Sequence, residues 1–164
     1  IDFAPDESFI GLLGKYQNLI ISQTFSKAMG LAAARVGLAY SSEEIISLYN
    51  KVKPPYNVSE LNQKAAIAAL ENSQVYRENL KTILAEKERL KAALLQINLV
   101  KKVFPSDTNF LLLEVSNANE LYTELVAKQI ITRNRNKQIS NCIRITVGTQ
   151  EENNKLINAL KNRP

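Results

Sequence analysis

The sequence predicts an α/β or α+β fold, in which helices alternate with short strands. Short apolar runs bounded by polar residues are typical of strands. They alternate along the chain with longer segments whose apolar residues recur at spacings of three and four, as on one face of a helix. The length of 164 residues, with 45% hydrophobic and 23% charged content, is sufficient for a sizeable core of ordinary globular composition.

The segment before the double proline at 54–55 should contain two strands between two helices. Glu43 and Glu44 lie in the first turn of the second helix, where the helix dipole favours anions. Ser41 or Ser42 precedes them as the N-cap. The prolines end this helix, because the residue before a proline is pushed out of the helical region. In order, the expected elements are a helix over 7–15, strands over 18–23 and 34–40, and a helix over 43–51.

Beyond the double proline, two helices and a second alternation are expected. Ser59 is the expected N-cap of a helix over 60–71, and Asn72 marks a break before a longer helix that reaches about residue 96. The apolar stripe of the longer helix, interrupted by Lys87, is interpreted as core packing. The elements expected after it are strands over 99–104 and 109–115, a helix over 118–128, strands over 130–133 and 142–147, and a helix over 150–161.

Composition excludes several classes of function. The chain has no histidine, so serine–histidine and cysteine–histidine nucleophile pairs and most zinc sites are impossible within it. The single cysteine, Cys142, cannot form an internal disulfide, and a reducing cytoplasm is the expected compartment. No apolar run is long enough for a membrane span, so no membrane partner is expected. The net charge of +5 comes from short, separated basic spots, and no nucleic-acid partner is expected either.

The segment 22–30, SQTFSKAMG, contains the candidate reactive residue of a chain without histidine, a lysine. It places Lys27 after a strand, at a turn rich in hydroxyl groups. A lysine with a depressed pKa can form a Schiff base, and an aldehyde cofactor with a phosphate would need donors such as Thr24, Ser26 and, eight residues after the lysine, Arg35. An ordinary loop with a surface lysine explains the same spacing, and the residues alone leave both interpretations open.

A family resemblance favours the first interpretation. The segment 24–37, TFSKAMGLAAARVG, resembles the lysine segment of fold-type I pyridoxal-phosphate aminotransferases, and is most similar to the histidinol-phosphate aminotransferases. Further segments, on both sides of the lysine segment, resemble the same family and occur in the same order as in its members. The resemblance therefore covers residues 1–160. These further segments are IDF and ESF (1–3 and 7–9), KVKPPYNVS (51–59) and CIRITVGT (142–149).

The resemblance implies a role for each matching residue near the lysine. Lys27 would bind pyridoxal 5′-phosphate as a Schiff base and then move the proton between the substrate α-carbon and the cofactor. Thr24, Ser26 and Arg35 would hold the cofactor phosphate.

Near the C-terminus, the resemblance implies arginines that bind substrate. Arg144 would clamp the substrate α-carboxylate, a task suited to the planar fork of a guanidinium. Arg133 would contact the substrate phosphate or the distal carboxylate of glutamate, and Arg135 is the competing choice for that role.

The resemblance also implies that this chain is the C-terminal half of a longer, homodimeric enzyme. Residues 1–54 would be the C-terminal portion of the large cofactor-binding domain, and residues 55–164 would be the connecting helices and the small α+β domain. Family members carry the aspartate that pairs with the pyridine nitrogen in their first half. The chain alone is therefore expected to be inactive.

The function expected from the resemblance is transamination between glutamate and imidazole-acetol phosphate, a step of histidine biosynthesis. A related fold-type I aminotransferase of the aspartate or aromatic type is the nearest alternative. A non-catalytic module that retains the scaffold is the alternative from another class.

Overall fold

The computed structural model describes residues 1–4, 6 and 8–163. The chain forms two compact units, Ile1–Leu80 and Lys81–Pro164, which we call the N-terminal and C-terminal units. This division reflects compactness within the chain. The predicted boundary after residue 54 concerns the domains of a longer enzyme, and stays a prediction. In the part of the chain that the structure describes, no helix is both long and apolar enough to cross a membrane.

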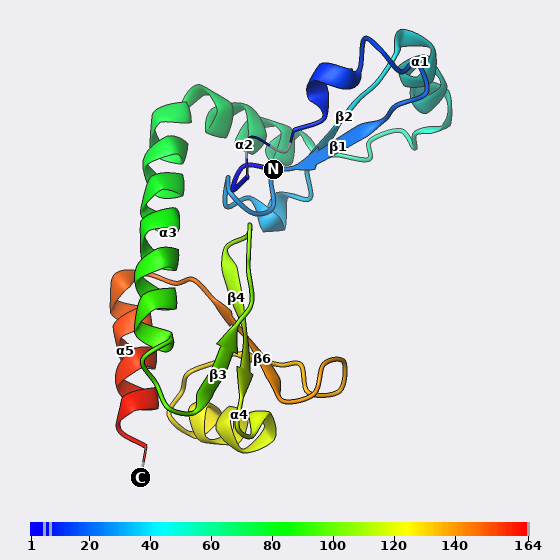
Figure 1. Ribbon diagram of the computed structural model, residues 1–164. Helices are drawn as coiled ribbons and strands as arrows, with labels where there is room; N and C mark the ends of the chain where they lie inside the picture. Colours follow the sequence, from blue (N-terminus) through cyan, green and yellow to red (C-terminus); the bar gives the residue numbers. More distant parts are fainter. Residues whose placement is uncertain (5, 7, 164) are drawn as a thin grey trace. The chain divides into compact units, whose positions relative to one another are not determined.

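The N-terminal unit contains a two-stranded antiparallel sheet and short helices (Figure 1). Ile21 pairs with Tyr40 and Thr24 with Gly37, so the two strands form a hairpin joined by the loop that carries Lys27. The elements are η2 (Ile10–Leu12), β1 (Ile21–Thr24), η3 (Ala32–Ala34), β2 (Gly37–Tyr40), α1 (Glu43–Val52) and α2 (Glu60–Glu71).

Three expectations for this unit were wrong in extent. The strand expected over 18–23 is β1, which begins at Ile21 and ends at Thr24. The helix expected over 7–15 is a 3-10 turn, η2, within its described residues; Gly11 and Gly14 weaken helix propagation there. Glu7 lies outside the described residues. The strand expected from residue 34 starts at Gly37, because Arg35 adopts a left-handed conformation with φ of 53° at the end of η3.

The helix starts follow the sequence closely. Ser42 is the N-cap of α1, and Ser59 is the N-cap of α2, where its hydroxyl accepts a hydrogen bond from the backbone N–H of Asn62 at 3.3 Å. Helix α2 ends before Asn72, and α3 (Ser73–Leu94) begins directly after it. The predicted break between the two helices is therefore confirmed.

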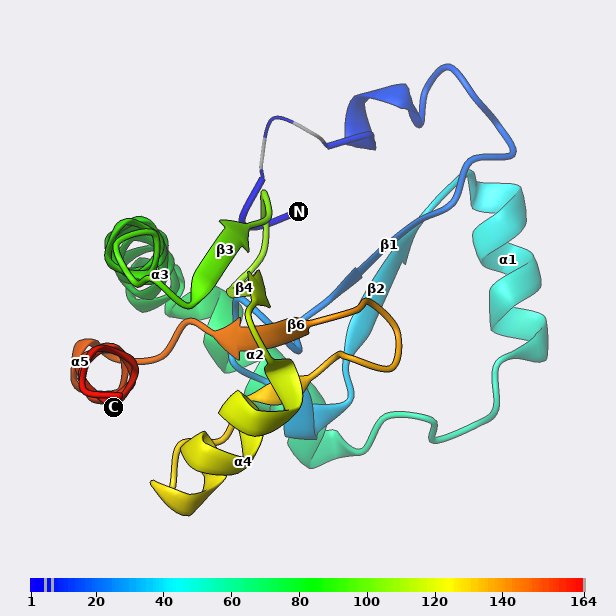
Figure 2. The ribbon, with the colours of Figure 1, turned by 60° about the horizontal axis from the view of Figure 1, so that its bottom comes forward.

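The C-terminal unit is a four-stranded antiparallel sheet with strand order β3-β4-β6-β5. In the view of Figure 2, α5 and the C-terminal end of α3 lie side by side at one face of this sheet. The elements after α3 are β3 (Val100–Val103), β4 (Phe110–Val115), α4 (Ala118–Ala127), β5 (Arg133–Asn134), β6 (Cys142–Thr146) and α5 (Gln150–Lys161).

The core lies between this sheet and its helices. Residues 111, 113 and 115 of β4 and residues 143 and 145 of β6 are buried, and they pack against apolar residues of α3, α4 and α5. Because side chains alternate along a strand, residues 110, 112, 144 and 146 lie on the opposite face of the sheet. The expected core role of the apolar stripe on α3 is confirmed for Leu90 and Leu94.

One strand of the sheet differs from expectation. Residues 130–132 were expected to pair, but β5 contains only Arg133 and Asn134. Gln129 has φ of 59°, and the N–H of Ile130 donates to the carbonyl of Leu125 at 2.8 Å, so this segment completes the end of α4. The backbone N–H of Ile130 is therefore already bonded to α4 and is not available for pairing with β6.

Asn153 stabilises the turn between β6 and α5. Its side chain is 2% exposed; it accepts from the N–H of Gly148 at 3.0 Å and donates to the Gly148 carbonyl at 3.0 Å and to Oε2 of Glu86 on α3 at 2.9 Å. We expect Asn153→Ala to lower the free energy of unfolding by about 2–3 kcal/mol, because it leaves buried polar groups without partners. Urea denaturation measures this. Asn154→Ala, an exposed neighbour, is the control, and equal stability of the two variants would contradict the assignment.

Candidate active site

The loop between β1 and β2 has an ordered backbone, and the side chain of Lys27 on this loop is exposed to solvent. Phe25 is 4% exposed; its N–H donates to the Val36 carbonyl at 3.2 Å, and its carbonyl accepts from Leu31 at 3.0 Å. Gly30, with φ of 70°, turns the chain so that its N–H reaches the Lys27 carbonyl at 2.9 Å. The backbone around Lys27 is therefore ordered, while its side chain is exposed.

Two of the predicted phosphate ligands lie against each other. The Thr24 hydroxyl donates to the Ser26 hydroxyl at 2.8 Å and accepts from the Ser26 N–H at 3.1 Å. The Arg35 guanidinium donates to the Ala32 carbonyl at 2.9 Å, and no carboxylate among the described residues forms an ion pair with it. Two adjacent hydroxyls and an unpaired guanidinium on one loop are donors that fit a phosphate.

A polar network that sequence reasoning missed lies beside this loop. Oδ1 of Asp2 accepts from the Tyr76 hydroxyl at 2.8 Å and from the Gln23 amide at 3.1 Å. Burial, and then the hydrogen bond and charge of Asp2, raise the pKa of Tyr76 to about 12. The network ties β1, which carries Thr24, to the start of α3. Residues 74 positions apart make this contact, and no local sequence signal predicts it.

Arg144 lies on the face of the sheet opposite the core. Arg133 is its direct partner on β5, and the guanidinium carbon of Arg144 is 4.7 Å from the ring centroid of Phe110. The Nε of Arg144 is buried and has no hydrogen-bond partner among the described residues. Burial lowers the pKa of Arg144, and the positive charges of Arg133 and Arg135 lower it further.

The three arginines form an unneutralised cationic cluster. Among residues 1–4, 6 and 8–163, no carboxylate forms an ion pair with Arg133, Arg135 or Arg144. Paired residues of an antiparallel sheet project to the same side, so Arg133 and Arg144 are neighbours; Arg135 is close enough to affect the pKa of Arg144. An anion bound beside these arginines would relieve their mutual repulsion. The geometry leaves both Arg133 and Arg135 available to it.

Cys142 begins β6 on the face of the sheet that carries Arg144, and it is fully buried. Burial, followed by the charge of Glu114, raises the pKa of its thiol, which disfavours the reactive thiolate. In the described part of the chain, no group of three or more histidine, cysteine or acidic side chains could hold a metal ion.

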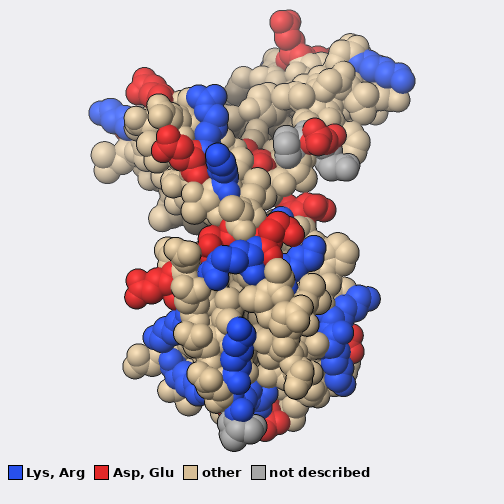
Figure 3. All heavy atoms as spheres, turned by 60° about the vertical axis from the view of Figure 1, so that its left-hand side comes forward, with Lys and Arg blue, Asp and Glu red and all other residues tan. Residues whose placement is uncertain are grey.

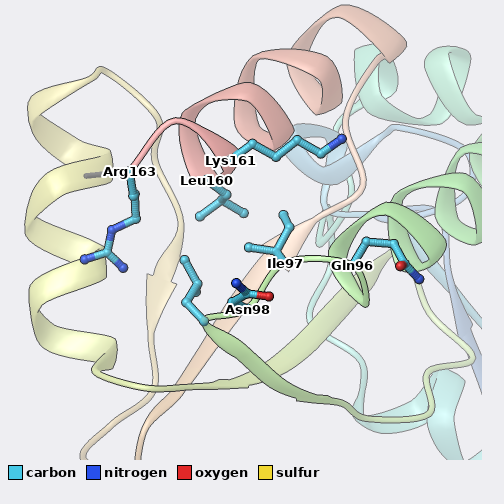
Figure 4. A pocket seen from close by; sticks show the side chains of 7 residues that line it. Gln96, Ile97, Asn98, Leu160, Lys161 and Arg163 are labelled. Carbon is cyan, nitrogen blue, oxygen red and sulfur yellow. The ribbon is translucent and has the colours of Figure 1, made fainter.

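Two cavities of the C-terminal unit are lined by residues other than the three arginines. A cavity of about 470 Å³ lies where α5 ends beside the turn after α3 (Figure 4). Lys161 and Arg163 both line it, and Arg163 is already paired with Glu124 at 2.6 Å and Glu120 at 3.6 Å. A second cavity, of about 410 Å³, is lined in part by Thr132, Ile145 and Leu156. On the face shown in Figure 3, side chains of both charges are interspersed.

Comparison with known proteins gives the family. Residues 1–160 match the model of the family described as aminotransferase class I and II. The chain is 48% identical over 163 residues to the histidinol-phosphate aminotransferase of Christiangramia forsetii, covering 98% of this chain and 47% of that protein. The chain thus spans about half the length of the curated relatives it matches.

Solved structures agree. The crystal structure of the histidinol-phosphate aminotransferase from Clostridium acetobutylicum is 27% identical, with a TM-score of 0.87, over 96% of this chain and 49% of that one. The enzyme of the same name from Sinorhizobium meliloti, in complex with pyridoxal 5′-phosphate, is 28% identical, with a TM-score of 0.76, over 88% of this chain and 41% of that one. The predicted fold class, part of a fold-type I transferase, is confirmed. The chain belongs to the class I and II aminotransferase family.

Proposed function

We propose that this chain carries the lysine and the anion-binding arginines of an aminotransferase that exchanges an amino group between glutamate and imidazole-acetol phosphate. The observation that carries the proposal is the pair Arg133 and Arg144, which form no ion pair with a carboxylate among the described residues. The Nε of Arg144 is also buried and has no hydrogen-bond partner there. The names of the similar proteins supply the substrate pair.

On the lysine side, each residue has a distinct task. Pyridoxal 5′-phosphate, when bound, supplies an electron sink for the deprotonated α-carbon. The hydroxyls of Thr24 and Ser26 and the guanidinium of Arg35 hold its phosphate. The Nζ of Lys27 holds the cofactor covalently and moves the proton at the substrate α-carbon.

On the arginine side, the two anions of the substrates are recognised. Arg144 binds the α-carboxylate with its planar fork, and the Phe110 ring fixes the plane of that fork. Arg133 binds the phosphate of histidinol phosphate or the distal carboxylate of glutamate, with Arg135 as the other candidate. A dianionic phosphate gains more than a carboxylate from this concentration of positive charge.

The proposal applies to the full-length protein, by which we mean this chain together with the remainder that its relatives carry. We propose that it acts as a homodimer in the cytoplasm. The 164-residue chain alone should not transaminate, because the family's aspartate for the pyridine nitrogen belongs to that remainder. A homologous aminotransferase of the aspartate or aromatic type is the alternative if phosphate substrates are not recognised.

Substitution of the competing arginines tests the phosphate assignment. In the full-length protein, Arg133→Ala should raise the KM for histidinol phosphate about thirtyfold, the loss of one charge-assisted contact of about 2 kcal/mol. It should also weaken inhibition by phosphate monoesters. Arg135→Ala is the matched variant, and a larger effect there would give the role to Arg135. A wild-type enzyme indifferent to phosphate monoesters would refute the histidinol-phosphate assignment.

A further inference from the structure

Lys87 is a buried lysine in the apolar stripe of α3. It is 6% exposed, and its Nζ donates to the backbone carbonyl of Ser106 at 2.9 Å. Among the described residues, no carboxylate pairs with it. One carbonyl acceptor compensates poorly for the desolvation of an ammonium, and an apolar side chain of similar length would pack there at lower cost. Stability alone therefore does not account for a lysine at this position.

Ser106, whose carbonyl accepts the hydrogen bond from Lys87, makes several hydrogen bonds within the β3–β4 turn. The hydroxyl of Ser106 donates to the Phe110 carbonyl and accepts from the Thr108 N–H at 3.3 Å. It also shares a hydrogen bond with the Thr108 hydroxyl at 3.0 Å. Lys87 thus anchors Ser106 through its backbone, and Ser106 anchors the first residue of β4 through its side chain.

Phe110 connects this turn to the arginine cluster. Leu112 is the direct partner of Arg144, so Phe110, two residues earlier on β4, lies diagonally opposite Arg144 on the same face. Its ring centroid is 4.7 Å from the guanidinium carbon. A ring at this distance attracts the cation and sets the plane of the guanidinium, and with it the direction of the N–H groups.

We infer that Lys87 is a positioning residue for Arg144: through Ser106 it holds the Phe110 ring against the guanidinium. All four residues belong to the C-terminal unit, so the link is complete within it. The inference rests on the proposed function in one respect, namely that Arg144 binds the substrate carboxylate. Lys87 then affects how well Arg144 is aligned without touching the substrate.

The position of the Phe110 ring can be measured in the 164-residue chain without cofactor. The ring current of Phe110 should displace the Nε–Hε proton signal of Arg144, which Arg144→Lys identifies by its disappearance from the ¹H–¹⁵N spectrum. Phe110→Leu removes the displacement. Lys87→Met should move the signal most of the way to its position in Phe110→Leu, and Ser106→Ala, which breaks the next link, should do the same. Lys81→Met, an exposed lysine on the same helix, should leave the signal unchanged.

The affinity for glutamate, measured by titration, tests whether the position of Arg144 affects substrate binding. Lys87→Met should weaken glutamate binding about fivefold, equivalent to about 1 kcal/mol. In a Phe110→Leu background it should have no further effect, because the ring it positions is absent. A purely structural role would lower the unfolding temperature and leave the Arg144 signal in place.

Two results would overturn the inference: an unmoved Arg144 signal in both Lys87→Met and Ser106→Ala, or an equal loss of glutamate affinity with and without Phe110. A wild-type Arg144 signal that does not respond to glutamate would instead count against the proposed carboxylate role. The ring-current comparison would still decide the role of Lys87 in that case.

Discussion

Replacement of Lys27 by alanine is expected to abolish covalent retention of pyridoxal 5′-phosphate and to lower kcat of the full-length protein by about a thousandfold or more. The proposal gives the Nζ of Lys27 both the covalent attachment and the proton transfer, and removal of a positioned acid–base group alone costs about 10²–10⁴-fold in rate. Absorbance of the bound cofactor and steady-state rates measure the two losses.

The control for Lys27 is Lys15→Ala. Lys15 is also an exposed lysine of the N-terminal unit, outside the β1–β2 loop in sequence, and its Nζ is 5.3 Å from the ring centroid of Tyr16. This variant should keep the cofactor and the rate. A Lys27→Ala protein that retains near wild-type kcat would remove Lys27 from the site.

Replacement of Arg144 should reduce substrate binding and at the same time stabilise the fold. Arg144→Met should raise the KM for glutamate about 30- to 150-fold, because a charge-assisted contact contributes about 2–3 kcal/mol. The same change removes a half-buried cation that is repelled by Arg133 and Arg135 and whose buried Nε has no hydrogen-bond partner among the described residues. The free energy of unfolding should therefore rise by about 1 kcal/mol. Kinetics of the full-length protein and urea denaturation of the chain give the two values.

Opposite signs of these two effects distinguish a binding residue from a structural one. Asn153→Ala provides the contrast, since that side chain has its partners within the chain and its loss should only destabilise. An Arg144→Met chain that is markedly less stable than wild type would show that Arg144 supports the sheet. The carboxylate role would then lose its main physical argument.

Local patterns in the sequence predicted the helices from residue 43 onward well. The helix expected over 150–161 is α5, Gln150–Lys161, whose start is set by a capping box between Thr149 and Glu152. Ser59 likewise sets the start of α2. Such signals lie within a few residues of the element that they determine, so a single sequence contains them.

Contacts between distant segments could not be predicted in the same way. Residues Arg133 and Arg144 were singled out by resemblance, but their pairing depends on the register of β5 and β6. Gln129 and Asn141, which precede the two strands, have left-handed backbone conformations, and these residue types adopt many other conformations. The Asp2–Tyr76 bond and the Lys87–Ser106 bond likewise join segments that no periodicity relates.

The most direct test of the central claim, that Lys27 is the cofactor lysine, is to identify the lysine that becomes labelled. The full-length protein is incubated with an equimolar amount of pyridoxal 5′-phosphate, reduced with borohydride, digested and analysed by mass spectrometry. We expect one stable pyridoxyl adduct, on the peptide that contains Lys27, and its loss in Lys27→Ala. An adduct at another lysine, or none above the level of Lys27→Ala, would contradict it.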